Sequence, residues 1–259
     1  MKISLITPSY KRSHYLKKNF ENLNKINKKF PNSFEWIIIT EKNDIKSIKV
    51  VKTFKKKFVK HLTGKFRNND KAFNHGVKYS KGELLVIYGD DDFITEKFIR
   101  EIKNKFNKKY KWYVGYGQYI NNKGQLIRKN LTTIKSLLIK NYNKNILLII
   151  NFIMTPSVCF SKKEFLAIKG LNQKIKYASD YFLWLEFSKK FQPKIIEKYI
   201  SKATFTSSTK TGSFSFTRYF QMFKVISKYQ NNLFILFLQI CSVFLIILFN
   251  FIKKRILKL

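Results

Sequence analysis

Three consecutive aspartates, Asp90, Asp91 and Asp92, stand directly after the apolar run of residues 84–88. Neighbouring carboxylates repel one another unless a cation neutralises them, and carboxylate oxygens are the ligands that hard divalent cations prefer. The chain of 259 residues contains six aspartates and has a formal net charge of +37. Half of the aspartates therefore share one short segment of a very basic protein. The triplet predicts a divalent-metal site at the end of a buried strand.

The elements that must position the triplet follow a repeating order. Apolar strands are expected at residues 3–6, 34–39, 58–62 and 84–88. Helices with one apolar face are expected to start near Ser13, Ile45, Asp70 and Thr95. This alternation predicts an α/β fold with a mainly parallel, doubly wound sheet. Ligands bind beyond the carboxyl ends of the strands in such sheets, so residues 7–10 and 40–44 should meet the triplet at one edge.

The pattern changes after residue 111. Residues 112–120 alternate between apolar and polar, and residues 121–124 (NNKG) are typical of a turn that returns as a hairpin through residues 125–129. Further along, Ser179 is a natural cap for a helix that carries Asp180 in its first turn.

Five blocks in this order resemble the family-2 glycosyltransferases of the GT-A fold. They are ITPSY at 6–10, WIII at 36–39 with Asp44 after it, KAFNHG at 71–76 running to KGE at 81–83, the aspartate triplet, and Gly170-Leu171 followed by SDYFLWL at 179–185. The resemblance covers roughly residues 1–220. It implies a Rossmann-like GT-A domain with a nucleotide-sugar-binding half at 1–110 and an acceptor half at 111–220.

The family transfers a sugar from a nucleotide-diphosphate donor, usually with inversion and with a divalent cation. The resemblance implies that the triplet holds this Mn²⁺ or Mg²⁺ ion and the donor ribose. Asp92 is the expected direct metal ligand, with Asp90 as a further metal ligand, and Asp90 or Asp91 as the ribose contact. A cation there would offset the charge that develops on the leaving nucleoside diphosphate.

The resemblance also implies where the nucleotide lies. Thr7, Pro8 and Ser9 resemble the segment whose backbone runs along the nucleobase, and either Glu41 or Asp44 is expected to contact the base itself. A UDP-sugar is the expected donor. Asp70 precedes the KAFNHG block and has two interpretations, a contact to the nucleotide or a helix cap.

The acceptor hydroxyl must lose a proton as it attacks the sugar, which requires a general base. The resemblance assigns this catalytic role to Asp180, in the SDYFLWL block. The start of a helix suits an ionised carboxylate, because the helix dipole stabilises negative charge there. An aspartate is also a common helix-starting residue without catalytic function. No QxxRW motif is present, so one sugar per cycle is expected rather than processive polymer synthesis.

The excess of basic residues, 52 against 15 acidic ones, suggests an anionic partner. Only six of these residues are arginines, whereas nucleic-acid readers rely on arginine for base edges and phosphates. The lysines are also spread along the whole chain. A nucleic-acid partner is therefore not expected, and two explanations remain open: composition set by an AT-rich coding sequence, and attraction to an anionic membrane surface.

Residues 233–252 are twenty mostly apolar residues without a charge, enough for a helix of about 30 Å. A buried or oligomer-forming helix, a membrane span and an in-plane membrane helix are all open. A single span would carry the basic residues at 253–258 outward, against the positive-inside tendency. We therefore expect residues 221–259 to form an amphipathic segment on the cytoplasmic face of the cell membrane, consistent with a lipid-linked acceptor in surface-polysaccharide assembly.

Two other classes of function remain in view. A nucleotidyltransferase would use the same metal-binding carboxylates, but no glycine-rich phosphate loop follows the first strand. A non-catalytic basic protein that binds membranes or polyanions would show salt-sensitive affinity without binding nucleotide sugars.

Overall fold

The computed structural model describes residues 1–175 and 178–205, together with single positions between 220 and 244. Most of the expected membrane-associating segment at 221–259 lies outside the described residues. Within the described part, no helix is both long and apolar enough to cross a bilayer. The predicted C-terminal membrane helix therefore stays a prediction.

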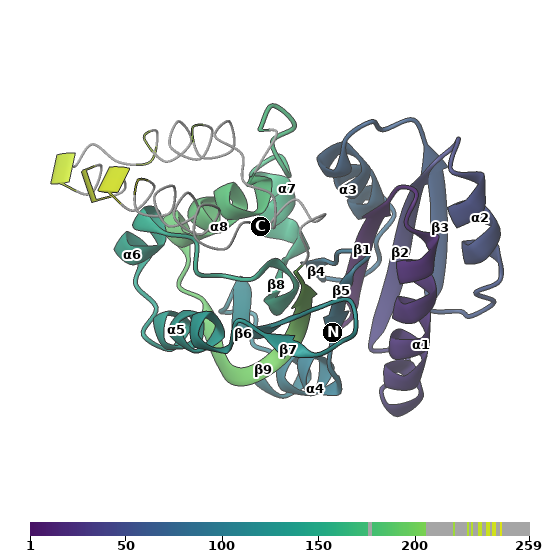
Figure 1. Ribbon diagram of the computed structural model, residues 1–259, viewed down its shortest axis with the longest axis horizontal. Coiled ribbons are helices and arrows are strands. Elements are labelled where there is room, and N and C mark those ends of the chain that lie inside the picture. The colour runs from purple at the N-terminus through teal and green to yellow at the C-terminus, as the bar shows by residue number, and fades with distance from the viewer. Residues whose placement is uncertain are drawn as a thin grey trace, which may run out of the picture.

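The first half of the chain forms the parallel half of one sheet, in the order β3-β2-β1-β4 (Figure 1). All neighbouring pairs in this half run parallel, which confirms the expected alternation of strands and helices. Its strands are β1 (Ile3–Ser9), β2 (Phe34–Glu41), β3 (Val59–Gly64) and β4 (Leu84–Ile87). Its helices are α1 (Ser13–Lys29), α2 (Ile45–Lys52) and α3 (Asn69–Lys78).

The sheet continues without a break as β8-β6-β9-β5, with β7 added beside β6. These strands are β5 (Asp92–Ile94), β6 (Trp112–Ile120), β7 (Leu126–Ile127), β8 (Val158–Ser161) and β9 (Lys194–Thr204). The β6–β7 pair confirms the expected hairpin around the turn at 121–124.

The prediction of a mainly parallel sheet is wrong for this second half, which is mixed. β8 is antiparallel to both β4 and β6, and β5 is antiparallel to β9. The register pairs Leu84 with Ser161, so β8 enters near the carboxyl end of β4 and runs back along it. The periodicity of a short apolar strand does not encode its direction. The direction of β8 depends instead on the end of the sheet at which the preceding segment delivers the chain.

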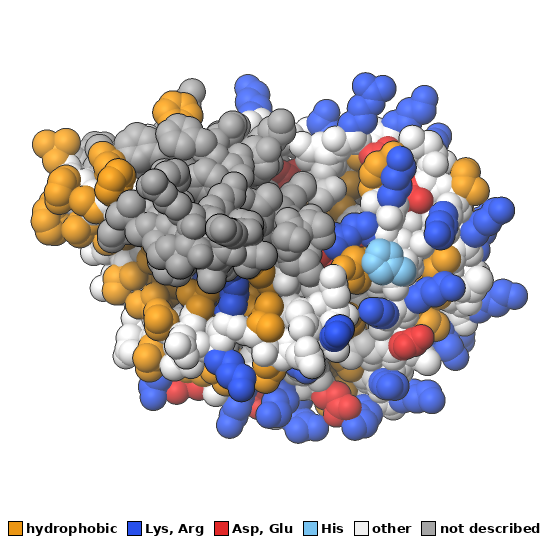
Figure 2. All heavy atoms as spheres, in the orientation of Figure 1, with side chains coloured by type: hydrophobic (Ala, Val, Ile, Leu, Met, Phe, Trp, Pro, Cys, Tyr) orange, Lys and Arg blue, Asp and Glu red, His pale blue; other side chains and the backbone are white. Residues whose placement is uncertain are grey.

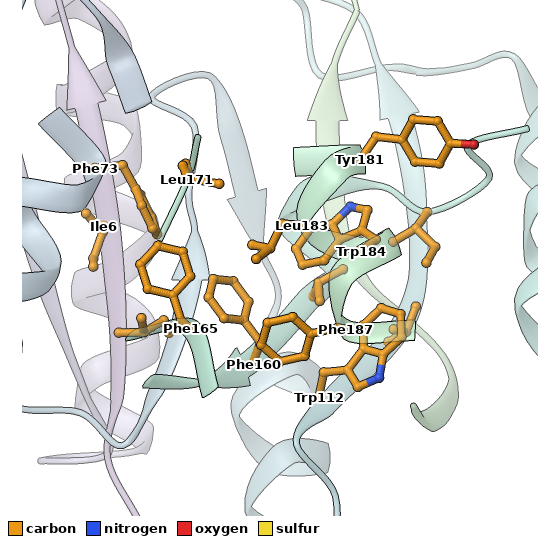
Figure 3. Close-up of a cluster of buried hydrophobic side chains, with 14 of the residues drawn as sticks. Ile6, Phe73, Trp112, Phe160, Phe165, Leu171, Tyr181, Leu183, Trp184 and Phe187 are labelled. Atoms are coloured by element: carbon orange, nitrogen blue, oxygen red, sulfur yellow. The ribbon is translucent and has the colours of Figure 1, made fainter. Parts of the chain in front are cut away.

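Helices cover both faces of the sheet. On one face, Ile3 and Leu5 of β1 pack with residues of α1, α2 and α4 (Glu96–Lys105). On the other face, Ile6 packs with α3 and with the later helices (Figure 3). These are α5 (Lys129–Lys140), α6 (Lys144–Ile149), α7 (Lys162–Ala167) and α8 (Ser179–Lys190), with the 3-10 turn η1 (Thr155–Ser157). The alternation of side chains along β1 therefore builds two cores.

The second core joins the two halves of the chain. Phe73 of α3 stacks edge-on against Phe165 of α7, and Phe165 in turn contacts Phe160 of β8. Phe160 also meets Trp184 of α8, as Figure 3 shows. These aromatic contacts place α8, which carries Asp180, at a fixed position relative to the first half of the chain.

Lysine and arginine side chains are spread over the visible face rather than gathered into one patch (Figure 2). This agrees with their even distribution along the sequence. The charge on this face therefore points to no single binding patch.

Candidate active site

The aspartate triplet lies in a tight turn at the carboxyl end of β4. The Tyr88 amide donates to the carbonyl of Ile6 (3.0 Å), which extends the pairing with β1, and the Asp92 amide then donates back to the carbonyl of Gly89 (3.2 Å). A Cβ atom at Gly89 would lie 2.5 Å from Oδ2 of Asp92, closer than two such atoms can approach. A residue without a side chain is needed here so that the Asp92 carboxylate can fold back over the turn.

Arg12, which the sequence prediction did not include, binds two of the three carboxylates. Its Nη1 lies 2.9 Å from Oδ1 of Asp90, and its Nη2 lies 2.6 Å from Oδ2 of Asp91. Burial opposes the charge of Arg12, but Asp90 and Asp91 more than compensate and raise the pKa of the guanidinium. The two ends of β1 and β4 are thus joined by an ion-pair fork.

Asp90 is buried and held at both its carboxylate and its backbone. Ser9 Oγ donates to Oδ2 of Asp90 at 2.7 Å, and Asn19 Nδ2 donates to the Asp90 carbonyl at 2.8 Å. Burial raises the pKa of Asp90 to about 6, although Arg12 acts in the opposite direction. Asp90 is therefore mostly ionised at neutral pH, and the predicted convergence of Ser9 with the triplet is present in the structure.

Asp92 has the least compensated negative charge of the site. Burial raises its pKa well above the usual range, and the neighbouring Asp91 and Asp90 carboxylates raise it further. Among the described residues Asp92 takes part in no ion pair, whereas the other two carboxylates share Arg12. A cation placed beside Asp92 would stabilise its ionised form against both burial and the repulsion from Asp90 and Asp91.

No group of three or more His, Cys, Asp or Glu side chains in the described residues is arranged to hold a metal by itself. A site completed by a substrate does not need such a group. Mg²⁺ is commonly held by one or two carboxylates together with substrate phosphates and water. The buried carboxylate of Asp92, with Asp90 two residues away, fits that partial ligand set.

The residues predicted to lie along the nucleobase occupy the carboxyl ends of β1 and β2. Pro8 pairs with Ile39, and Ser9 pairs with Thr40, in the parallel register. The Thr7 side chain points inward, where its hydroxyl accepts a hydrogen bond from Trp36 Nε1 at 2.8 Å. Thr7 can therefore contribute its backbone to this edge, while its side chain supports the core.

Asp44 and Glu41 hold the loops that frame this edge. Asp44 accepts hydrogen bonds from the backbone amides of Ser47 (3.2 Å) and Lys11 (2.6 Å), which caps α2 and ties it to the loop after β1. Glu41 accepts from the amides of Phe66 (3.0 Å) and Arg67 (2.6 Å) in the loop before α3. The structure thus gives both carboxylates a local structural role.

Two of these amide donors lie in the left-handed region of the backbone. Lys11 has φ 58° and Arg67 has φ 54°, a conformation that costs a residue other than glycine about 1 kcal/mol or more. In each case the strained residue directs its N–H toward a carboxylate at the end of β2. Strain of this kind is concentrated at functional sites, which agrees with the predicted location.

Asp180 lies in the first turn of α8, as expected. Its Oδ1 accepts from the amide of Tyr181 at 2.8 Å, and its Oδ2 accepts a short hydrogen bond from the hydroxyl of Thr155 in η1. Ala178, the residue before the start of α8, adopts a left-handed conformation with φ 62°. Both carboxylate oxygens are therefore oriented by neighbouring groups.

Asp70, far from Asp180 in the sequence, contacts the start of α8 at the residue before Asp180. Oδ1 of Asp70, in the first turn of α3, accepts a hydrogen bond from Ser179 Oγ at 2.9 Å. The cap of α3 is instead Asn68, whose side chain accepts from the amides of Asp70 and Lys71. The interpretation of Asp70 as the helix cap is therefore wrong, and its nucleotide contact remains untested.

The segment η1 connects the two parts of the site. It supplies Thr155, which binds Asp180, and it packs against β4 and β5 on either side of the triplet. From the last strand, Thr204 Oγ1 donates to the backbone carbonyl of Asp91 at 2.5 Å. The predicted donor and acceptor residues therefore belong to one continuous arrangement of β1, β4, η1 and α8.

Four of these supporting residues were missed from the sequence: Arg12, Asn19, Thr155 and Thr204. Two carried a usable signal. Arg12 is one of six arginines in a chain that otherwise uses lysine, and Asn19 interrupts the apolar face of α1 between Leu16 and Leu23. Thr155 and Thr204 carried none, because they reach the site through the mixed half of the sheet.

Residues 4–182 match the sequence profile of the family described as Glycosyl transferase family 2. A relative from Methanococcus voltae, dolichyl N-acetyl-alpha-D-glucosaminyl phosphate 3-beta-D-2,3-diacetamido-2,3-dideoxy-beta-D-glucuronosyltransferase, is 28% identical over 127 residues. That match covers 46% of this chain and 39% of the relative. The chain thus matches well under half of the length of this larger enzyme.

Solved structures with a similar fold include TarS from S. aureus in complex with UDP, with a TM-score of 0.66 and 15% identity over 88% of this chain and 65% of that chain. A mannosyltransferase from Pyrobaculum calidifontis, solved with GDP-Man and Mn²⁺, has a TM-score of 0.62 and 9% identity over 93% of this chain and 73% of that one. At these identities the similarity establishes the fold alone.

Proposed function

This chain belongs to glycosyl transferase family 2, and on that basis we propose that it moves one sugar per cycle from a UDP-sugar to an acceptor hydroxyl, with inversion and with a divalent cation. The observation that carries the proposal is the two-part site, in which the triplet and Asp180 are linked through η1. The family assignment makes the chain a glycosyltransferase, and it decides against the nucleotidyltransferase and non-catalytic alternatives.

On the donor side, Asp92 would bind the cation, with Asp90 as a further ligand. The raised pKa values of both carboxylates support this assignment, because burial and mutual repulsion leave negative charge that a cation would neutralise. When bound, Mn²⁺ or Mg²⁺ would offset the charge that develops on the leaving diphosphate. Ser9 and Arg12 would keep Asp90 and Asp91 in place while the donor enters.

The nucleotide would lie across the carboxyl ends of β1 and β2, along the backbone of Thr7, Pro8 and Ser9. Glu41 and Asp44 already receive backbone amides, so a direct contact to the base would use their remaining lone pairs. Asp70 would lie between the nucleotide and α8.

On the acceptor side, Asp180 would take the proton from the attacking hydroxyl. General-base catalysis requires a carboxylate whose orientation is fixed, and Thr155 and the Tyr181 amide orient both of its oxygens. The proton would leave the acceptor as its oxygen attacks the anomeric carbon from the side opposite the diphosphate. That geometry inverts the configuration of the sugar.

The acceptor would be a lipid-linked saccharide, as in surface-polysaccharide assembly. The name of the relative from M. voltae, with its dolichyl-phosphate acceptor, supports a lipid-linked substrate. Apolar side chains at described positions near the C-terminus are exposed: Leu233 by 80%, Phe237 by 60% and Phe244 by 62%. Such side chains, followed by basic residues at 253–258, suit the cytoplasmic face of an anionic membrane.

The decisive experiment is a screen of nucleotide sugars for Mn²⁺-dependent binding and hydrolysis by the full chain. With the donor identified, Asp92→Asn should lower transfer by about a hundredfold or more, and Asp180→Asn by about 10² to 10⁴. Glu197→Gln is the matched control, since it makes the same change on an exposed side chain of β9. The proposal fails if no donor binds, or if both aspartate variants retain full transfer.

A further inference from the structure

Arg12 is fixed in place by groups on several sides of its guanidinium. It binds Asp90 and Asp91 through separate nitrogens, at 2.9 and 2.6 Å. Its guanidinium carbon also lies 4.6 Å from the centre of the Tyr15 ring. The Tyr15 hydroxyl in turn donates to Oδ1 of Asn122, in the turn between β6 and β7, at 3.0 Å. Arg12 is therefore a built part of the site rather than a mobile surface side chain.

The charges of the triplet are divided unequally by this arrangement. Asp90 and Asp91 share the single positive charge of Arg12, and Asp92 forms no ion pair within the described part of the chain. Three carboxylates and one guanidinium leave two formal negative charges in the donor-free site. Arg12 thus occupies, for two of the carboxylates, the position of a counter-ion.

We propose that Arg12 is a positioning residue whose single charge partly offsets those of Asp90 and Asp91 in the donor-free enzyme and so keeps the affinity of the triplet for a free divalent cation low. The donor diphosphate then supplies both the missing ligands and the missing negative charge. The cation consequently enters together with the donor. This inference rests on the metal site of the proposed function.

The direction of the effect follows from Coulomb's law. A fixed positive charge within a few ångströms of a divalent cation opposes its binding, even at the high effective dielectric of a partly open site. Removing that charge restores the full attraction of the three carboxylates. We expect a gain of about tenfold in the affinity of the donor-free enzyme for Mn²⁺.

The test measures Mn²⁺ binding to the full chain without nucleotide, from the electron paramagnetic resonance signal of free Mn²⁺. Arg12→Met should bind Mn²⁺ about tenfold more tightly than the wild type. Arg12→Lys, which retains the charge, should remain close to the wild type. Lys17→Met serves as the control, because it removes one charge from an exposed residue of α1, the helix that follows Arg12, and should leave Mn²⁺ affinity unchanged.

Three results would overturn the proposal. Arg12→Met could bind donor-free Mn²⁺ no more tightly than the wild type, or it could weaken UDP binding alone, which would make Arg12 a diphosphate ligand. If Arg12→Met does not fold, the Mn²⁺ affinity of the wild type is compared with and without UDP. The proposal requires Mn²⁺ to bind at least about tenfold more weakly without UDP, and a smaller difference would overturn it. Absence of Mn²⁺ binding by every form, with or without UDP, would instead reject the metal site itself.

Discussion

Replacing Asn19 with alanine should destabilise the protein and disturb the triplet at the same time. Asn19 is fully buried in α1. Its Nδ2 donates to the Asp90 carbonyl at 2.8 Å, and its Oδ1 accepts from the hydroxyl of Tyr88 at 2.5 Å. Burial raises the pKa of Tyr88, so this hydroxyl stays protonated and acts as the donor. The single side-chain amide of Asn19 thus links α1 to two groups: the Tyr88 side chain at the end of β4 and the backbone of the triplet.

The magnitude follows from the two groups that lose their partner. A buried polar group left without a hydrogen bond costs about 1–3 kcal/mol. Asn19→Ala leaves the Tyr88 hydroxyl and the Asp90 carbonyl in that state, so we expect a loss of about 3 kcal/mol in the free energy of unfolding. Because Asp90 also loses its backbone anchor, kcat should fall by about tenfold or more.

Urea unfolding of a double-mutant cycle with Tyr88→Phe is the assay. Phenylalanine removes the hydroxyl that Asn19→Ala would leave unpaired. The double variant should therefore lose about 1–2 kcal/mol less than the sum of the two single variants. Two results would show that these hydrogen bonds do not hold the triplet. The losses of unfolding free energy in the two single variants could add within about 0.5 kcal/mol, or Asn19→Ala alone could cost less than about 0.5 kcal/mol.

Three further predictions concern the same site. Gly89→Ala should lower Mn²⁺-dependent transfer strongly, because its Cβ would meet Oδ2 of Asp92 at 2.5 Å; unchanged kinetics would contradict the geometry of the turn. Thr155→Val removes the hydroxyl that orients Asp180 and should lower kcat about tenfold with little change in donor affinity, as measured by steady-state kinetics and calorimetry. Since the folded-state pKa of Asp90 is raised from 3.8 to about 6, the metal-free protein should lose up to about 3 kcal/mol of stability as pH rises from 4 to 6. Asp90→Asn should reduce that loss, as measured by urea unfolding at a series of pH values, and an identical pH dependence in both proteins would count against it.

The parallel half of the fold could be predicted from the sequence because its strands are short apolar runs separated by helices with one apolar face. The expected strand at 34–39 and helix from Ile45 correspond to β2 and α2. The carboxyl end of β2 lies where the topology required, at the same edge of the sheet as the triplet after β4. The path of β8 could not be predicted, because an apolar strand of four residues has no pattern that distinguishes its direction or its neighbour.

The candidate site residues could be predicted where their residue type was rare in the chain. The contacts that support them could not be predicted. Aspartates stand out in a basic chain, so the triplet was an evident candidate, and the family resemblance added Asp180. The partners that orient them use common side chains, such as the hydroxyls of Ser9 and Thr155, which pair with residues more than twenty positions away. Long-range pairs of this kind depend on the packed arrangement of strands, which local sequence does not specify.

The two left-handed residues beside β2 have a thermodynamic consequence for donor binding. Lys11 and Arg67 already direct their amides onto Asp44 and Glu41, so the loops that frame the predicted nucleotide edge are ordered by the chain itself. A ligand that orders a loop gives up about 0.5–1.5 kcal/mol for each side chain that it immobilises. If the nucleotide binds as proposed, that loss of entropy has already been met during folding, and the nucleotide would enter a preformed site.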